Sequence, residues 1–334
     1  MSGEILGITL KKINNEEIKP MKVHGSNDNR PVKGEKLFPE VYSNIYICAR
    51  KKSGKTVVIQ KILKDCSTKS TTILAFCSTV NKDKNWIAIK KWCKEKGIAF
   101  EGFPSIMDGK VDFLNRFLHR LEEEAEEELV DNEEEEEVKP TKSSQYGKGG
   151  GKILPLFGNG KDEDEYEGSE QDYSESDQSD NEEDMFGISH DLSMQGKRLF
   201  DRRNRTSIKP SEKYQAPEYI LVFDDLSNEL KLPSLVSLLK KNRHYKLKVI
   251  LSSQYLNDLK PESIKQMDYV LLFKGQTEDK LEKVRRDCDL ALEADTLKKI
   301  YDNAVSEPYG FLYIDVRNDQ YRSKFDKMYC IPEK

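Results

Sequence analysis

The sequence predicts an α/β fold with a mainly parallel central sheet, helices on both faces of that sheet, and antiparallel strands near the carboxyl end. Short apolar runs alternate with helical patterns, which is typical of a parallel sheet covered by its crossover helices. The runs that predict strands are residues 45–48, 71–77, 98–103, 219–223, 248–251 and 269–273. The alternating stretches 310–316 and 321–329 predict an antiparallel pair at the end.

Apolar residues recur at helical spacing between these runs. The repeats predict helices at residues 57–63, 83–96, 111–121 and 230–239. In the second helix Trp86, Ile89 and either Trp92 or Cys93 share one face, which we expect to pack against the sheet. Residues 1–36 are polar and predict an arm that contains at most a single strand.

A strongly acidic segment divides the predicted domain into two halves. Residues 121–190 hold 25 Asp or Glu against 5 Lys, a net charge of −20; since the whole chain carries −5, the rest carries +15. This composition buries too little apolar surface to offset the entropy of ordering. We expect a long disordered acidic insertion at residues 122–212, between domain halves at 37–121 and 213–334. The basic remainder suits a phosphate-rich partner, but a solvated lysine-rich surface would carry the same charge.

The cysteines and the apolar runs exclude several classes of protein. The six cysteines are Cys48, Cys66, Cys77, Cys93, Cys288 and Cys330. No CxxC pair or neighbouring histidine completes a metal site, so we interpret them as buried or idle thiols in a reducing compartment. No leader-like start and no apolar run of about 18 residues is present. We therefore expect a soluble intracellular protein that is not secreted.

A phosphate-binding loop is predicted between the first strand and the first helix. It reads Ala49, Arg50, Lys51, Lys52, Ser53, Gly54, Lys55 and Thr56. This matches G-x-x-x-x-G-K-[ST] except at Ala49, which fits only where φ stays negative. In such a loop backbone N–H groups hold the phosphates, Lys55 neutralises their outer oxygens and Thr56 offers its hydroxyl to Mg²⁺. A surface turn that reads SGKT by chance is the structural alternative.

Two carboxylates follow the apolar strand 219–223. Ligands in open α/β sheets collect at the carboxyl ends of the strands, so we expect both side chains beside the phosphate loop. We assign Asp224 to Mg²⁺, held through water, and Asp225 to orienting or deprotonating the attacking water. Many motors of this kind use Glu in the second role, and Asp225 is one methylene shorter. An acidic turn capping a buried strand is the alternative.

Gln254 ends a further apolar strand. In P-loop ATPases of the ASCE type an extra strand lies between the loop strand and the acid strand, and a polar residue at its end reaches the γ-phosphate. A strand-end polar residue without a role is the alternative. The agreement of the loop, the acids and Gln254 predicts a P-loop NTPase fold of the ASCE type, with ATP and Mg²⁺ as ligands.

Two arginines are candidates for stabilising charge in the transition state. Arg243 precedes the Gln254 strand at the end away from the loop, so in one subunit it is far from bound nucleotide. In a ring it would face a neighbour's phosphates or the central channel. Arg50 lies inside the loop and would act within its own subunit. A solvated basic residue is the alternative for each.

Segments around these residues form a wider pattern. They are Phe223–Asp225, Asn242–His244, Val249–Gln254, Leu272–Phe273, Tyr309–Asp315 and Phe325–Asp326. Together they resemble the poxvirus-type genome-packaging ATPases of the FtsK/HerA superfamily, over roughly 40–120 and 215–330. The resemblance implies a homo-oligomeric ring that hydrolyses ATP to move double-stranded DNA, without reading its bases, into a preformed viral capsid. It also implies a capsid or portal-vertex partner and a location in the host cytoplasm, at the virus factory, and in the virion.

Other functions remain open at this point. A cellular or plasmid DNA translocase of the same superfamily would usually carry a membrane anchor or a DNA-reading appendage, and the sequence shows neither. A non-catalytic adaptor would hold nucleotide structurally and recruit basic partners through the acidic segment. A small-molecule kinase would need an Arg-rich lid after the acids, which is missing. The acidic segment itself would mimic DNA if it occupied a basic channel.

Overall fold

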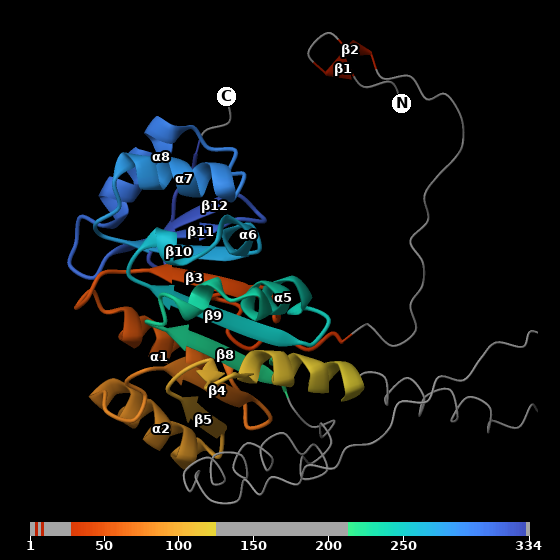
Figure 1. The fold of residues 1–334 in the computed structure, drawn as a ribbon. Coiled ribbons are helices and arrows are strands. Elements are labelled where there is room, and N and C mark those ends of the chain that lie inside the picture. The colour runs from red at the N-terminus through yellow and green to blue at the C-terminus, as the bar shows by residue number, and fades with distance from the viewer. Residues whose placement is uncertain (1–3, 6–7, 10–27, 125–212, 332–334) are drawn as a thin grey trace, which may run out of the picture. The chain divides into compact units, whose positions relative to one another are not determined.

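A nine-stranded sheet forms the centre of the described structure (Figure 1). The computed structural model describes residues 4–5, 8–9, 28–124 and 213–331. The strands are β3 (Asn44–Cys48), β4 (Thr72–Cys77), β5 (Ala99–Phe103), β8 (Tyr219–Asp224), β9 (Leu247–Ser253), β10 (Tyr269–Phe273), β11 (Phe311–Asp315), β12 (Gln320–Ser323) and β13 (Lys327–Met328). Their order is β13-β12-β11-β10-β3-β9-β8-β4-β5.

The direction of the strands confirms the predicted fold class. All neighbours from β10 across to β5 are parallel, and β10 to β13 are antiparallel. Strand β9 lies between β3 and β8, as expected for the ASCE type. The predicted final strand 321–329 is wrong in one respect, because a turn at residues 324–326 divides it into β12 and β13.

The helices agree with the periodicity over the first half of the chain and differ later. They are α1 (Lys55–Cys66), α2 (Lys84–Lys96), α5 (Pro233–Lys241), α6 (Pro261–Ile264), α7 (Glu278–Asp287) and α8 (Ala294–Ala304), with short 3-10 turns η2 (Glu229–Lys231) and η3 (Leu256–Asp258). A further helix begins at Phe113 and continues to Glu124, the last described residue before the gap. The helix predicted at 230–239 starts later, because Leu232 is extended and Pro233 takes the first helical position.

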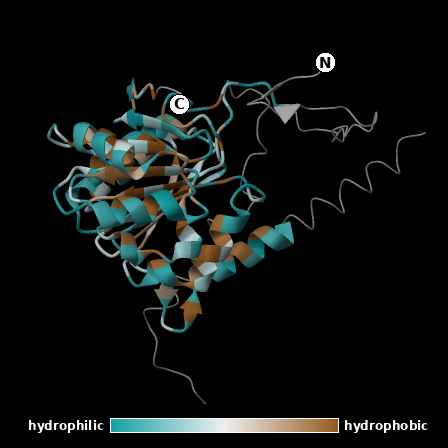
Figure 2. Ribbon diagram, turned by 90° about the horizontal axis from the view of Figure 1, so that it is seen from above, coloured by the Kyte–Doolittle hydropathy of each residue, from teal (hydrophilic) through white to brown (hydrophobic). Residues whose placement is uncertain are grey.

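The two faces of the sheet are covered by different helices. Ile59 and Ile62 of α1 and Trp86 and Ile89 of α2 belong to one core cluster, which also takes alternate residues from the strands. Right-handed crossovers place α5 and α6 on the opposite face, because β8–β9–β10 crosses the sheet in the reverse sense to β3–β4–β5. Apolar colour gathers on the strands, and the helices are polar on their outer sides (Figure 2).

The chain divides into two compact units, residues 1–122 with 210–334 and residues 123–209. Apart from Glu123 and Glu124, the second unit has no described residues, so the predicted acidic insertion lies outside the described part of the chain. Most of the predicted arm also lies outside it. Where the arm is described, β1 (Glu4–Ile5) and β2 (Ile8–Thr9) form an antiparallel pair in place of a single strand. A second short pair joins β6 (Met107–Asp108) and β7 (Val111–Asp112).

The six cysteines are unpaired, and five of them are buried, with only Cys330 exposed. This agrees with the expectation of buried or idle thiols. Within the described ranges, the structure contains no helix with the length and apolar character required to cross a bilayer.

The register of the strands brings the predicted site residues to one edge of the sheet. Cys48 at the end of β3 is opposite Ser253 of β9, and Ser252 is opposite Asp224 of β8. The loop that follows Cys48 therefore leaves the sheet at the same edge as Asp224.

Candidate active site

The loop between β3 and α1 has the backbone that a phosphate cradle requires. Ala49 is fully buried and donates its N–H to the carbonyl of Ser253 over 3.0 Å. Within the loop only Lys52 (φ 62°) and Gly54 (φ 90°) have positive φ. Ala49 therefore meets the condition under which alanine replaces the expected glycine, and the left-handed position that glycine must occupy is Gly54.

The amino end of α1 presents unpaired polar groups. The helix has no side-chain cap and no acidic residue in its first turn, which contains Thr56. Ser53 Oγ is buried, yet it has no hydrogen-bond partner among the described residues. Buried polar groups normally have partners, and a helix amino terminus attracts negative charge. This end of α1 is thus suited to an anion that accepts several hydrogen bonds.

Lys55 lies between the two predicted carboxylates. Its Nζ is 3.1 Å from Asp224 Oδ1 and forms a closer ion pair with Asp225 Oδ1. The side chain of Asp224 is only 5% exposed and that of Asp225 is 36% exposed. The ion pairs balance charge, but the angles leave Lys55 Nζ and Asp224 Oδ1 without a hydrogen bond in the described structure. Both atoms retain the capacity to bind a further group.

Helix α2 fixes the orientation of Asp224. Because Asp224 alternates with Ile220 and Val222 along β8, its side chain points to the face covered by α1 and α2. There Trp86 Nε1 donates a hydrogen bond to Asp224 Oδ2 over 3.2 Å. From the sequence Trp86 is expected only on a packing face, and no local pattern marks it as a partner of the acid.

Asp225 and Gln254 are joined at the same edge. Asp225 has a positive φ of 55° and donates its N–H to the carbonyl of Ser252 over 3.2 Å. The Gln254 side-chain amide donates to Asp225 Oδ1 over 3.3 Å. The structure therefore brings Lys55, Asp224, Asp225 and Gln254 together, as the motif spacing predicted.

Arg50 is held against the loop that follows β10, which no sequence motif connects with the site. Its guanidinium Nη2 donates to the carbonyl of Gly275 over 3.1 Å. A Cβ on Gly275 would lie 2.4 Å from Arg50 Nε and would displace the arginine, and the φ of 112° at Gly275 independently favours glycine. The Tyr301 hydroxyl accepts from the N–H groups of Gly275 and Gln276, both at 2.9 Å, and donates to the Phe273 carbonyl. Lys51 and Lys52, in contrast, are exposed at the tip of the phosphate loop.

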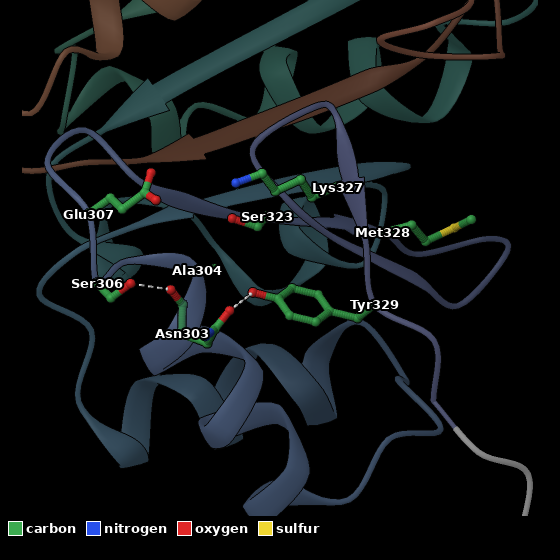
Figure 3. Close-up of a pocket in the computed structure, with 8 residues that line it drawn as sticks. All are labelled: Asn303, Ala304, Ser306, Glu307, Ser323, Lys327, Met328 and Tyr329. Carbon is green, nitrogen blue, oxygen red and sulfur yellow. Dashed lines mark hydrogen bonds between the residues drawn. The ribbon is translucent and has the colours of Figure 1, made fainter.

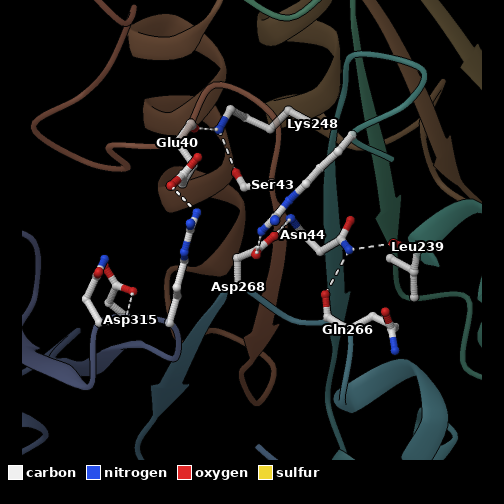
Figure 4. Close-up of polar contacts among 11 residues, drawn as sticks. Glu40, Ser43, Asn44, Leu239, Lys248, Gln266, Asp268 and Asp315 are labelled. Carbon is white, nitrogen blue, oxygen red and sulfur yellow. Dashed lines mark hydrogen bonds and ion pairs between the residues drawn. The ribbon is translucent and has the colours of Figure 1, made fainter. Parts of the chain in front are cut away.

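Arg243 lies at the opposite edge of the sheet, as expected. Its Nη2 donates to Asp268 Oδ1 over 2.6 Å. Asp268 Oδ2 accepts from the N–H of Asn44 at the start of β3, and both of these residues are labelled in Figure 4. Since β3 has five residues, this cluster lies about 16 Å along the strand from the phosphate loop. The side chain of Arg243 is 51% exposed.

Cys48 and Cys77 end the strands β3 and β4 close to the site, which raises the question of a thiol nucleophile. Burial raises the pKa of both thiols. Gln276 Nε2 contacts Cys48 Sγ at 3.4 Å. A neutral buried thiol is a weak nucleophile, so the two cysteines are poor candidates for that role.

The donor set fits a magnesium nucleotide better than a structural metal. No group of three or more His, Cys, Asp or Glu side chains in the described residues is placed to hold an ion by itself. Mg²⁺ in phosphate sites usually takes one or two protein ligands and completes its shell with water and phosphate oxygens. Thr56 and Asp224, whose Oδ1 faces Lys55 without a hydrogen bond, are suited to that smaller share.

Comparison with known proteins gives remote structural likenesses. No protein-family model matches the sequence, and no curated protein matches it. The genome-packaging NTPase B204 of Sulfolobus turreted icosahedral virus 2, solved with AMP, is 14% identical with a TM-score of 0.44, covering 88% of this chain and 100% of its own. The DNA-packaging ATPase B204 of Sulfolobus turreted icosahedral virus is 15% identical with a TM-score of 0.40, covering 87% and 98%. At this distance the activity must be argued from the residues of this chain.

Proposed function

We propose that this protein is an ATPase that uses Mg²⁺. The observation that carries the proposal is the position of Lys55, at the amino end of α1 and within ion-pair distance of both Asp224 and Asp225. The two carboxylates balance the charge of Lys55 and leave one negative charge over, which suits a divalent cation. The amino end of α1 suits the phosphates that ATP brings with that cation.

Each residue of the edge has a role that follows from its chemistry. The backbone N–H groups that begin α1, together with Ser53, bind phosphate oxygens, and Lys55 neutralises their charge. Thr56 and Asp224 would hold Mg²⁺, which when bound draws charge from the phosphate oxygens. Trp86 keeps the Asp224 carboxylate in one orientation.

Asp225 is the residue we propose to orient the attacking water or to accept its proton. Its 36% exposure gives water access, whereas Asp224 is enclosed. Gln254 contacts the same carboxylate oxygen as Lys55, so a movement of Lys55 toward phosphate changes the environment of Gln254. This contact gives Gln254 a means of reporting the state of the nucleotide to β9.

We propose further that hydrolysis drives the movement of double-stranded DNA into a viral capsid, with domain halves at 37–121 and 213–334. One support is the net charge of +15 on the chain outside residues 121–190. The other is the resemblance of the sequence segments named above to genome-packaging ATPases. Contacts to phosphates alone would give binding that ignores sequence and weakens steeply with salt. A ring of subunits, a capsid or portal-vertex partner and a place in the host cytoplasm and the virion belong to the same proposal.

Phosphate release by the purified protein tests the ATPase. We expect turnover that needs Mg²⁺, increases with double-stranded DNA of any sequence and is lost in Lys55→Ala. If the wild type turns over ATP no faster than Lys55→Ala, with or without DNA, the proposed ATPase motor is refuted. Nucleotide binding without turnover would instead favour the non-catalytic adaptor.

A mixing experiment tests the role of Arg243 between subunits. Lys55→Ala and Arg243→Ala proteins are each expected to be inactive. In a mixed ring, some intact Lys55 sites face an intact Arg243 of a neighbour, so mixing should restore part of the activity. Absence of any recovery in rings shown by mass to be mixed would remove Arg243 from the catalytic set and leave Arg50.

A further inference from the structure

An aromatic side chain lies beside the phosphate loop without belonging to the core. Tyr309 is 70% exposed, the most exposed large hydrophobic residue in the described chain. A Cβ on Gly54 would lie 3.1 Å from Tyr309 Cδ1, so the ring rests against the loop residue that precedes Lys55. Because most of the Tyr309 ring is exposed, it buries little apolar surface and adds little to the stability of the core.

The backbone at Tyr309 is unusual for a tyrosine. The turn Glu307-Pro308-Tyr309-Gly310 is closed by the Gly310 N–H, which donates to the Glu307 carbonyl over 3.1 Å. Pro308 occupies the second position, and Tyr309 occupies the third with a positive φ of 60°. Turns of this kind place Gly or Asn at the third position, because a Cβ there is strained by about 1 kcal/mol or more.

The surroundings hold this strained turn in place. A Cβ on Gly310 would lie 2.4 Å from the Ala304 carbonyl oxygen, so the chain passes tightly against the end of α8. Glu307 forms an ion pair with Lys324 over 2.8 Å. Figure 3 shows the neighbouring cavity wall, where the hydroxyls of Ser306 and Tyr329 both donate to Asn303, each over 2.7 Å. The turn that bears Tyr309 is thus held in place by its contacts.

The sheet order places this ring on a particular side of the loop. Phe311 of β11 is opposite Phe273 at the carboxyl end of β10. Strand β10 flanks β3 on one side, and β9 and β8 follow on the other. Asp225 and Gln254 therefore lie on one side of the phosphate loop and Tyr309 on the other. A triphosphate whose outer phosphate meets the carboxylates has room to extend its nucleoside over the other side of the loop, where Tyr309 lies.

We propose that Tyr309 is the platform on which the nucleobase of the bound triphosphate stacks, and that a purine is the base it favours. The inference rests on the proposed function and names a specificity-determining residue for it. Purines offer a larger π face than pyrimidines, and stacking of a base on an aromatic side chain contributes about 1–3 kcal/mol. The strain at φ 60° is retained because the ring at this position contacts the ligand.

Binding of two ligands separates this role from the phosphate site. Calorimetric titration compares Mg·ATP with inorganic tripolyphosphate, which has the phosphates and lacks the base. Tyr309→Asn removes the ring and suits the left-handed turn, while Tyr309→Phe keeps the ring. We expect Tyr309→Asn to weaken ATP binding by about 5- to 150-fold, to leave tripolyphosphate binding within twofold and to reduce the preference for ATP over CTP. Tyr309→Phe should bind all three as the wild type does.

Other outcomes overturn the inference in distinguishable ways. Unchanged ATP affinity in Tyr309→Asn, or an equal loss for both ligands, would show that the ring does not contact the base. Tighter tripolyphosphate binding in Tyr309→Asn would make the ring a cover of the cradle instead. If the wild type binds neither ligand more tightly than Lys55→Ala, both the proposed function and this inference are refuted.

Discussion

Trp86 holds Asp224 by a hydrogen bond of 3.2 Å from its indole Nε1 to Oδ2, while Oδ1 of the same carboxylate faces Lys55. The two oxygens thus have separate partners. Because the indole is only 1% exposed and belongs to α2, its position is set by the core and does not depend on a ligand. The carboxylate is preorganised before anything binds.

Replacing Trp86 by Phe should lower ATP turnover by about tenfold and raise the Mg²⁺ concentration needed for half-maximal activity. The change removes the N–H donor, and a hydrogen bond to a charged group contributes about 1.5–3 kcal/mol. Magnesium titrations of steady-state turnover give the measurement. The control is Trp92→Phe on the same helix, where the ring packs near Lys64 and away from the acid. Equal Mg²⁺ dependence in both variants would contradict a positioning role.

Removal of Lys55 should destabilise the protein in the absence of nucleotide. Lys55→Ala leaves the buried Asp224 without its cation, and breaking such a pair costs about 3–5 kcal/mol, less here because Asp225 is partly exposed. We expect the free energy of unfolding in urea to fall by about 2–4 kcal/mol. Adding Asp224→Asn to Lys55→Ala should recover at least half of the loss. Exposed Lys52→Ala is the control, and a double variant as unstable as the single one would refute the account.

The local part of the site could be predicted because the chemistry follows the chain. Eight consecutive residues form the phosphate loop, and apolar strands identify the edge at which Asp224 and Gln254 emerge. Parallel strands bring their carboxyl ends to one edge, and the expected strand order, with the Gln254 strand between the loop strand and the acid strand, makes these residues neighbours. The condition on Ala49 could be stated from steric arguments alone.

Contacts between distant segments could not be predicted. Trp86 and Asp224 are 138 residues apart, and Tyr309 meets Gly54 across the width of β10. Helix α7 was missed because eight of its ten residues are charged, so only Leu281 and Val284 mark its buried side. The one local signal for Tyr309 is its place between Pro308 and Gly310, which marks a turn but not what the turn presents.

Changing Ala49 to the expected glycine should lower the free energy of unfolding and leave the ATPase activity within twofold of the wild type. The φ of Ala49 is not in the left-handed region, so glycine relieves no strain there. The change adds freedom to the unfolded chain and removes a buried methyl group, together about 1–1.5 kcal/mol. Thermal unfolding should show Tm lower by about 2–6 °C. Gly54→Ala is the contrast: at φ 90° and against Tyr309, it should abolish nucleotide binding. A higher Tm in Ala49→Gly would contradict this reading of the loop.

The edge strand β5 gives a pH dependence that is independent of the active site. Burial raises the pKa of Glu101 from 4.5 to about 7, and its Oε2 has no hydrogen-bond partner among the described residues. Between these two values the folded state keeps a proton that the unfolded chain has lost. The contribution of Glu101 to the free energy of unfolding should therefore be fully present below pH 4.5. It should fall as the pH rises to about 7, by at most about 3 kcal/mol.

Glu101→Gln should remove this dependence, because the amide stays neutral in both states. The measurement is urea unfolding of the wild type and the variant at intervals from pH 4.5 to 8. Glu95→Gln serves as the control, since Glu95 is 60% exposed on α2 and its replacement should leave the profile unchanged. The difference between wild type and Glu101→Gln should grow across this window and level off above it. Parallel profiles would show that the Glu101 carboxylate reaches water and ionises normally.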